Sequence, residues 1–379
     1  MVSEVYCLNF GGNRMTLLLS DEEVRELVTV EMCLESLEPA YRELGQGLAI
    51  SSPRCDVITA NPKSANQEPC HGLKTMTGSV SGFNVGAIRI NSDVLTWPSS
   101  DHGFKRVKVP KALGHRYTGM VLLFSLETGE LLSLFPDASI QRMRVGTTSA
   151  LGAKYLARKG ASSLGLYGSG WQAGSHLMAF TKVRQVKEVK VYSPNWDRCQ
   201  AFCKEMEPQA KCTVVPMKKP EDVMKGSDMV MAATNSLEHV ILGKWVEKGM
   251  YLCSVKPGEI DQQAYDRCDL IVMHTHQLEP NHYLANGGRP EPPGFVKEKA
   301  SFFPAGFKGI AWDKPPLLSD VILGKGPTRT SEDQIICFSN NLGIGVQFAA
   351  VGQAVYRKAK KEGKGRELPT EWFSQLNHP

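Results

Sequence analysis

A glycine turn between a short apolar segment and an expected helix constrains this chain more than any other feature. Residues 164–173 read LGLYGSGWQA, a Gly-x-Gly-x-x-Ala pattern. In this pattern the first glycine makes a tight turn, the second lets the backbone approach a phosphate, and the small third residue allows helix and strand to pack closely. The helix N-terminus adds free N–H groups and a partial positive charge. We therefore expect the pyrophosphate of a dinucleotide to bind at Gly168, Ser169, Gly170, Trp171, Gln172 and Ala173.

From about residue 145 the chain alternates between expected helices and expected strands. Helices are predicted over Thr147–Arg158, from the glycine turn to about 184, over 196–206 and over 220–225. Strands are predicted over 163–167, 188–192, 212–215, 228–234, 250–255 and 270–273. This alternation predicts a parallel sheet covered on both faces, with ligands at the carboxyl ends of its strands.

The first third of the chain has a different pattern. A helix is predicted over 21–47, where acidic residues at 21–23 precede regularly spaced apolar residues. Short strands follow, including a hairpin formed by 119–125 and 131–135. Residues 276–316 are predicted as loop, 335–338 as a strand and 345–361 as a helix. The expected fold class is α/β: a Rossmann dinucleotide-binding domain plus an α+β domain.

Composition excludes several classes of function. The 379 residues carry a formal net charge of +5 without a basic stripe, so we expect no nucleic-acid partner. No apolar run is long enough for a membrane span, and the first residues do not read as a signal peptide. The ten cysteines form no Cys-x-x-Cys pair, which favours free thiols in a cytoplasmic protein. His274, His276 and His282 have no carboxylate at ligand spacing, so no metal is expected.

The end of the second predicted strand of the alternating region bears on which dinucleotide binds. An acidic residue there would bind the ribose 2′-hydroxyl of NAD. This chain has Ser193, and Asn195 and Arg198 lie nearby and could contact a 2′-phosphate. We therefore expect NADP(H) to be preferred, with NAD(H) as the alternative. Asp197 would reverse this preference, although we expect it to cap the following helix.

Two segments together resemble the ornithine cyclodeaminase/mu-crystallin family. The first is RVGTTSALGAKYLAR at 144–158, and the second is GSGWQA at 168–173. Further matches are ATNS at 233–236, GKWV at 243–246, EID at 259–261, and the C-terminal stretches around Gln347 and Tyr356. The resemblance therefore extends over nearly the whole chain.

The resemblance implies a homodimer of two-domain subunits. A substrate-binding and dimerisation domain would cover 1–143 and be completed by 319–379, and a Rossmann domain would cover 144–318. The family's shared chemistry implies hydride transfer between a nicotinamide and the α-carbon of a small-molecule imino or amino acid. It also implies further contacts with the dinucleotide from Ala233, Thr234, Asn235 and Val255.

Fixed cations are needed to hold the carboxylate of such a substrate, and arginine is suited to bind it bidentately. By the resemblance, Arg54 and Arg144 match two of the family's carboxylate-binding positions. Arg89 falls at the third, where the family has lysine, and Lys74 is a second cation near the same site. An arginine is a poor general acid, so Lys74 is the first candidate for the proton donor and His115 a distant second. Lys74 and Arg89 are thus the expected catalytic residues, and all four cations are expected to bind substrate.

Two departures from the family pattern argue against ornithine as substrate. Lys256 stands where cyclodeaminases have an aspartate for the side-chain amine, and Phe348 replaces a frequent second aspartate. Glu259 and Asp261 are expected to cap a helix. The favoured function is an NAD(P)H-dependent imine reductase or amino acid dehydrogenase. The alternatives are cyclodeamination with catalytic NAD+ and a non-catalytic NADPH-dependent ligand-binding protein.

Overall fold

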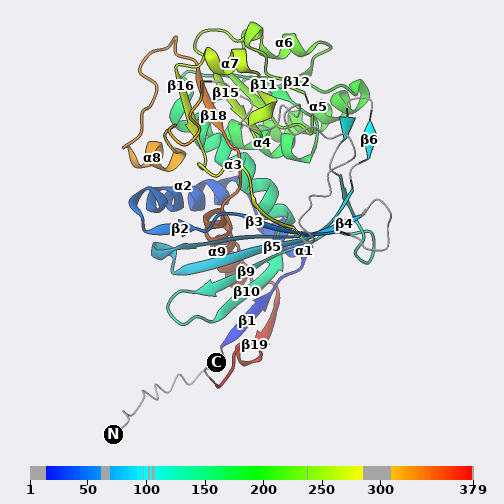
Figure 1. Cartoon of the computed structure of the whole chain (residues 1–379), viewed down its shortest axis with the longest axis vertical. Coiled ribbons are helices and arrows are strands. Elements are labelled where there is room, and N and C mark those ends of the chain that lie inside the picture. The colour runs from blue at the N-terminus through cyan, green and yellow to red at the C-terminus, as the bar shows by residue number, and fades with distance from the viewer. Residues whose placement is uncertain are drawn as a thin grey trace.

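The protein is built around two large sheets joined by a helical layer (Figure 1). The computed structural model describes residues 14–60, 69–96, 98–100, 103–104, 107–236, 238–284 and 309–377. Within these ranges the first sheet has ten strands and the second has seven. A two-stranded ribbon, β6 (Ser99–Ser100) with β7 (Gly103–Phe104), stands apart from both.

The first sheet is mostly antiparallel and has the central order β17-β3-β4-β5-β9-β10-β1-β19, with β2 beside β4 and β8 beside β5. The predicted hairpin of β9 and β10 is confirmed. Helices α2 (Val30–Gln46) and α9 (Gly345–Glu362) pack on one face. The strands are β1 (Met15–Leu18), β2 (Ala49–Ser51), β3 (Cys55–Thr59), β4 (Cys70–Val80), β5 (Val85–Thr96), β8 (Val107–Val109), β9 (Thr118–Ser125), β10 (Leu131–Pro136), β17 (Asn281–Leu284) and β19 (Arg366–Pro369).

The second sheet is entirely parallel, as the alternating pattern predicted, and has the order β13-β12-β11-β14-β15-β18-β16. Helices α4 (Trp171–Val183), α5 (Trp196–Ala210), α6 (Pro220–Met224) and α7 (Gln262–Asp266) connect or flank its strands. The short helix α8 (Leu318–Leu323) packs against α2. The strands are β11 (Ser163–Tyr167), β12 (Glu188–Tyr192), β13 (Thr213–Pro216), β14 (Met229–Ala232), β15 (Tyr251–Ser254), β16 (Leu270–Met273) and β18 (Ile336–Ser339).

Two of the predicted helices have different bounds. The helix expected over 21–47 is interrupted: α1 (Asp21–Leu27) ends before Val28, and Thr29 caps α2 through its side chain. The helix expected from Thr147 begins nine residues earlier, as α3 (Ala138–Leu156). Helix α3 contacts α4, α2 and α9, so it lies between the two sheets. Arg144 is therefore in the middle of a buried helix and not at its start.

The chain crosses between the sheets at places that the expected division does not anticipate. Strand β17 lies within the range assigned to the Rossmann domain, yet it pairs with β3 of the first sheet. Strand β18 lies in the segment expected to complete the first domain, yet it sits between β15 and β16. Part of the 276–316 segment is thus a strand, and residues 285–308 lie outside the described part of the chain.

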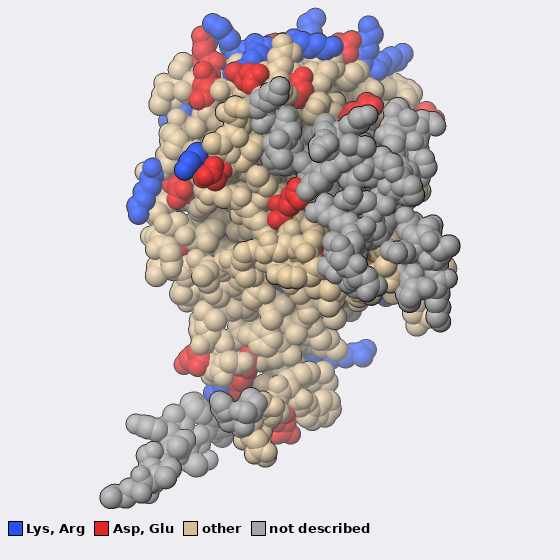
Figure 2. All heavy atoms as spheres, viewed as in Figure 1, with Lys and Arg blue, Asp and Glu red and all other residues tan. Residues whose placement is uncertain are grey.

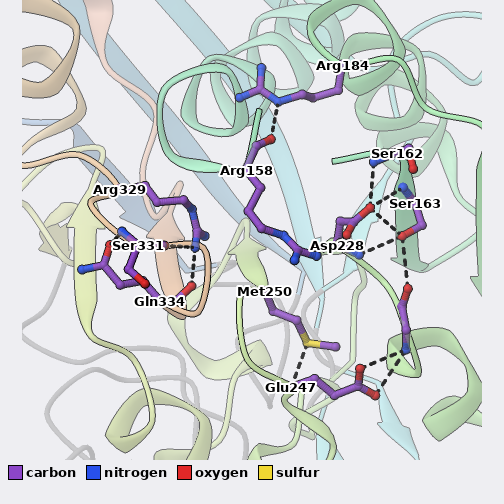
Figure 3. Close-up of polar contacts among 11 residues, drawn as sticks. Arg158, Ser162, Ser163, Arg184, Asp228, Glu247, Met250, Arg329, Ser331 and Gln334 are labelled. Carbon is purple, nitrogen blue, oxygen red and sulfur yellow. Dashed lines mark hydrogen bonds and ion pairs between the residues drawn. The ribbon is translucent and has the colours of Figure 1, made fainter. Parts of the chain in front are cut away.

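Asp228 links the N-terminal ends of the adjacent strands β11 and β14 in the second sheet (Figure 3). Its carboxylate accepts hydrogen bonds from the backbone N–H groups of Ser162 and Ser163, at 2.7 and 3.0 Å, and pairs with Arg158. Burial opposes ionisation there, but these hydrogen bonds and Arg158 outweigh it and lower the pKa of Asp228. This link is structural, because ligands bind at the opposite, carboxyl edge of such a sheet.

Candidate functional site

The buried face of β5 changes from apolar to charged and back along the strand. Alternate residues point to the face covered by α9, and those at 89, 91 and 93 are Arg, Asn and Asp between apolar Ala87 and Leu95. Strand register then aligns Asp56, Lys74, Asn91 and Gly119 across four strands. Residues up to 63 positions apart thus share one row, in which Asp56, Lys74 and Asn91 are polar and Gly119 leaves space beside Asn91.

Three of the expected site cations have carboxylate partners. Arg54 donates both Nε and Nη2 to Asp56, at 2.8 and 2.9 Å. Lys74 lies 2.6 Å from Asp93, whose other oxygen is 3.0 Å from the half-exposed Lys108. The Nε–H of Arg89 donates to Asp137 at 2.7 Å, and Asn91 donates to the same oxygen at 3.2 Å. Asp56, Asp93 and Asp137 thus neutralise these three cations.

Arg144 differs from these cations, because no carboxylate of the described residues pairs with it. Its two Nη groups donate to the amide oxygens of Gln347 and Gln141, each at 2.7 Å, and its buried Nε–H has no acceptor. Burial, and next the charge of Arg89, lowers the pKa of Arg144 to about 9. The guanidinium therefore remains charged at neutral pH and lacks an anionic partner.

Phe348 explains how two arginines are accommodated side by side. The Cζ atoms of Arg89 and Arg144 lie 5.5 and 5.2 Å from the centroid of its buried ring. Such cation–π contacts stabilise a desolvated guanidinium. The site thus has an apolar, electron-rich surface where the family pattern often has an aspartate.

A buried hydrogen-bond network connects Arg144 to the second sheet. Gln347 donates its amide N–H groups to Tyr41 and Thr148, at 2.9 and 2.7 Å, and the Tyr41 hydroxyl lies 2.8 Å from Nε2 of His274. The sequence did not identify Tyr41, Asp137 and Gln347 as site residues, and His274 was weighed only as a metal ligand and rejected in that role. The sequence did contain a signal for Gln347, because this residue lies in a segment that matches the family pattern.

The glycine turn has the geometry that a phosphate requires. Gly168 has φ +110°, and a Cβ there would lie 2.6 Å from the carbonyl oxygen of Ala233. Gly170 precedes α4 without any side-chain cap, and a Cβ on it would meet no atom within 4 Å. The first-turn N–H groups of α4 are therefore open to an anion. Gly146 of α3 packs directly on the backbone of Ser175, which brings the helix of Arg144 against the helix of the turn.

At the end of β12 the predicted residues have different surroundings. Ser193 is half-buried, and Asn195 caps α5 through a 2.9 Å hydrogen bond from the Arg198 backbone N–H. The expectation that Asp197 caps this helix is wrong, because Asn195 does so. The side chains of Asp197 and Arg198 are exposed in the first turn of α5.

A buried carboxyl group holds the loop that follows β14. One oxygen of Glu259 accepts hydrogen bonds from the N–H and the hydroxyl of Thr234, both at 2.7 Å. The cap expected of Glu259 is therefore wrong, whereas Asp261 does cap α7. Lys256 donates to the carbonyl oxygen of Ser236 at 3.3 Å. Glu259 and Lys256 thus fix the 234–236 segment, which includes two of the residues expected to contact the dinucleotide.

Other predictions concern absences. Within the described ranges, no three His, Cys, Asp or Glu side chains gather as a metal site, and no helix could cross a membrane. Of the cysteines that the structure describes, Cys33, Cys55, Cys199, Cys203, Cys212, Cys253, Cys268 and Cys337 are free thiols.

The parallel sheet with its glycine turn before α4 defines a Rossmann-like α/β class of protein, and Arg54, Lys74, Arg89 and Arg144 add a largely buried group of cations. The family model for the ornithine cyclodeaminase/mu-crystallin family matches residues 103–363. The chain belongs to that family.

Named relatives align over almost their whole length. Alanine dehydrogenase of Archaeoglobus fulgidus is 25% identical over 93% of this chain and 98% of that protein. Delta(1)-pyrroline-2-carboxylate reductase of Bacillus cereus is 23% identical over 93% of this chain and 99% of that protein. Among solved structures, the Thermococcus litoralis Delta(1)-pyrroline-2-carboxylate reductase, in complex with NADH and L-proline, superposes with a TM-score of 0.72, 21% identity and coverage of 93% of this chain and 100% of that chain. The expected family and the Rossmann fold are thereby confirmed, and the oxidoreductase class is supported by what these relatives are.

Proposed function

We propose that this protein is an NAD(P)H-dependent oxidoreductase that reduces an imino acid to an amino acid, or catalyses the reverse oxidation. The observation that carries this proposal is Arg144, a buried guanidinium with two amide partners, an unpaired Nε–H and no carboxylate among the described residues. The carboxylate of an imino acid supplies the missing anion. The named relatives, which act on pyrroline-2-carboxylate and alanine, support the same substrate class.

The other residues of the cluster have separate roles in this proposal. Arg89 is held by Asp137 and stays charged, so it contributes electrostatic attraction and not a proton. The Lys74 ammonium donates the proton that the substrate nitrogen gains on reduction. Although burial opposes it, the charges of Lys74 and Lys108 lower the pKa of Asp93, so an ionised carboxylate stabilises the Lys74 ammonium between turnovers. When bound, the dinucleotide supplies the hydride that the imine carbon accepts.

The dinucleotide would lie along the carboxyl edge of the second sheet. The open first turn of α4 and the positive φ of Gly168 fit its pyrophosphate. We propose NADP(H) as the preferred form, because the segment after β12 offers the Ser193 hydroxyl and the exposed Arg198 to a 2′-phosphate. Binding constants for NADPH and NADH, measured side by side, test this preference.

We also propose that two copies associate through the outer face of the first sheet. Strand register aligns Val57, Leu73 and Tyr283 on that face, and these apolar side chains are 44%, 39% and 57% exposed. In the view of Figure 2 charged residues gather over the second sheet, whereas the surface over β5, β9 and β10 is largely uncharged. A solved archaeal alanine dehydrogenase of the same fold is a dimer. The molar mass in solution, measured by light scattering, tests whether the protein is a dimer. The cytoplasmic location stays a prediction.

The decisive experiment measures oxidation of NADPH and NADH with Δ1-pyrroline-2-carboxylate, and reduction of NADP+ and NAD+ with L-proline and L-alanine. Loss of a charge-assisted carboxylate contact in Arg144→Ala lowers kcat/KM roughly 100-fold or more. Arg25→Ala, which changes an exposed side chain of helix α1, is the control. Normal turnover by the Arg144 variant contradicts the proposed site. Dinucleotide binding without any turnover by the wild type contradicts the proposed activity.

A further inference from the structure

Gln347 is held so that it can adopt only one orientation. Its Oε1 accepts from Nη1 of Arg144 at 2.7 Å and from the backbone N–H of Ile344 at 3.1 Å. Its Nε2 donates to Tyr41 and Thr148. All four hydrogen bonds that an amide side chain can readily make are therefore formed, and the oxygen that faces Arg144 cannot exchange places with the nitrogen. The direction of the Arg144 guanidinium follows from this orientation.

His274 completes the network from the side of the second sheet. It directly follows β16, and its Nδ1–H donates to the carbonyl oxygen of Leu342 at 2.6 Å. Its Nε2 therefore accepts from the Tyr41 hydroxyl, at 2.8 Å. Burial lowers the pKa of His274 to about 3 against the opposing hydrogen bond to Leu342, and the charge of Arg144 adds to the lowering, so the ring is neutral at physiological pH.

The Leu342 bond gives His274 a second influence on Arg144. Gly343 follows Leu342, and a Cβ at Gly343 would lie only 2.5 Å from Nη1 of Arg144. The backbone that His274 holds therefore packs directly on the guanidinium. Two connections start at His274: one runs through Tyr41 and Gln347, the other through the Leu342–Gly343 backbone, and both end at Arg144.

We propose that Tyr41 and His274 are positioning residues, which orient the Arg144 guanidinium for the substrate carboxylate and tie that orientation to the dinucleotide-binding sheet. This inference rests on the proposed function. Tyr41 comes from α2 and His274 from the end of β16, and both reach Arg144 through other groups: Tyr41 through Gln347, and His274 through Tyr41 and the Leu342 backbone. Small errors in the placement of a bidentate donor reduce both affinity and rate.

Tyr41→Phe removes the hydroxyl that joins Gln347 to His274 and that also lies 2.9 Å from the Thr148 hydroxyl. We expect KM for the imino acid to rise about five- to tenfold, as for the loss of one hydrogen bond, while the Kd of the dinucleotide stays unchanged. Tyr251→Phe is the matched control, because its buried hydroxyl makes a 3.2 Å hydrogen bond to the Ser149 carbonyl outside the network. His274→Gln repeats the test from the other side, should Tyr41→Phe fail to fold.

Two readouts separate positioning from a merely structural role. Because Tyr41 acts through Gln347, the double variant Tyr41→Phe/Gln347→Met should raise KM no further than Gln347→Met alone. In ¹⁵N-arginine-labelled protein, the Nε–H signal of Arg144, assigned by its loss in Arg144→Lys, should exchange with solvent faster in Tyr41→Phe than in Tyr251→Phe.

The possible results are distinguishable. An unchanged KM in a folded Tyr41 variant, multiplicative KM effects in the double variant, or an unaltered Arg144 signal each overturns the positioning role. No turnover by the wild type on any imino or amino acid counts against the proposed function instead, and the Arg144 signal still tests the positioning role in that case.

Discussion

Glu259 makes a sharp prediction about how stability depends on pH. Its carboxyl group is fully buried, and one oxygen accepts two hydrogen bonds from Thr234. Burial raises the pKa of Glu259 from its ordinary 4.5 to about 7, against the opposing effects of Lys256 and Thr234. Between these two pKa values, the native state therefore keeps a proton on Glu259 that the unfolded chain has released.

The sign follows from proton linkage. Below about pH 4.5 both states are protonated, and the group costs nothing. Between that pH and about 7 the folded protein must either keep its proton or ionise a buried group, so stability falls as the pH rises. The two pKa values differ by 7 − 4.5 = 2.5, which corresponds to about 3 kcal/mol lost by the wild type at slightly alkaline pH.

Glu259→Gln isolates this effect, because glutamine keeps the oxygen that Thr234 binds but cannot ionise. We expect the free energy of unfolding of the variant, relative to the wild type, to improve by about 2–3 kcal/mol between about pH 5 and pH 8. Urea unfolding at a series of pH values measures the difference. If an amide N–H of the glutamine lacks a hydrogen-bond acceptor, the free energy of unfolding of the variant falls by an amount that does not change with pH. Parallel curves for the two proteins across this range would refute the reasoning.

Four further outcomes are expected. Gly343→Ala places a methyl group against Arg144, so KM for the imino acid rises at least tenfold while dinucleotide affinity holds in titrations. Lys74→Met removes the proposed proton donor and lowers kcat roughly 100-fold or more, measured in the steady state at saturating substrate. Ser193→Asp shifts the Kd ratio toward NADH and away from NADPH; an unchanged ratio argues against that position. Asp228→Asn lowers Tm at neutral pH. This deficit shrinks as the pH falls below about 4, because the pKa of Asp228 is lowered in the folded state, so its ionised carboxylate stabilises the fold at higher pH and loses that effect on protonation.

The sequence predicted those parts of the fold that depend on local pattern. Apolar runs bounded by turn residues gave the parallel strands, and the glycine turn came between β11 and α4 because only glycine readily adopts the φ of +110° found at Gly168. Boundaries were less accurate. The predicted helix from Thr147 begins at Ala138, since small and polar residues along α3 obscure any apolar periodicity.

The division into domains was harder to predict, because a strand pattern does not say which sheet a strand joins. Strands β17 and β18 each pair with the sheet that the expected division did not assign to them. Which sheet a strand joins depends on its pairing with strands far away in the sequence, and the strand's own residues carry no signal of that choice.

For the site, the sequence by itself identified cations of the right kind: Arg54, Lys74, Arg89 and Arg144. It could not say what holds them. Asp56 lies only two residues after Arg54, but pairing of β4 with β5 brings Asp93 to Lys74, and Asp137 reaches Arg89 from just before α3. Helix packing places Gln347 and Phe348 beside Arg144. Only the tertiary structure decided that Arg144 is the one of these four cations without a carboxylate among the described residues, because the partners of Lys74 and Arg89, and Gln347 beside Arg144, come from residues that are remote along the chain.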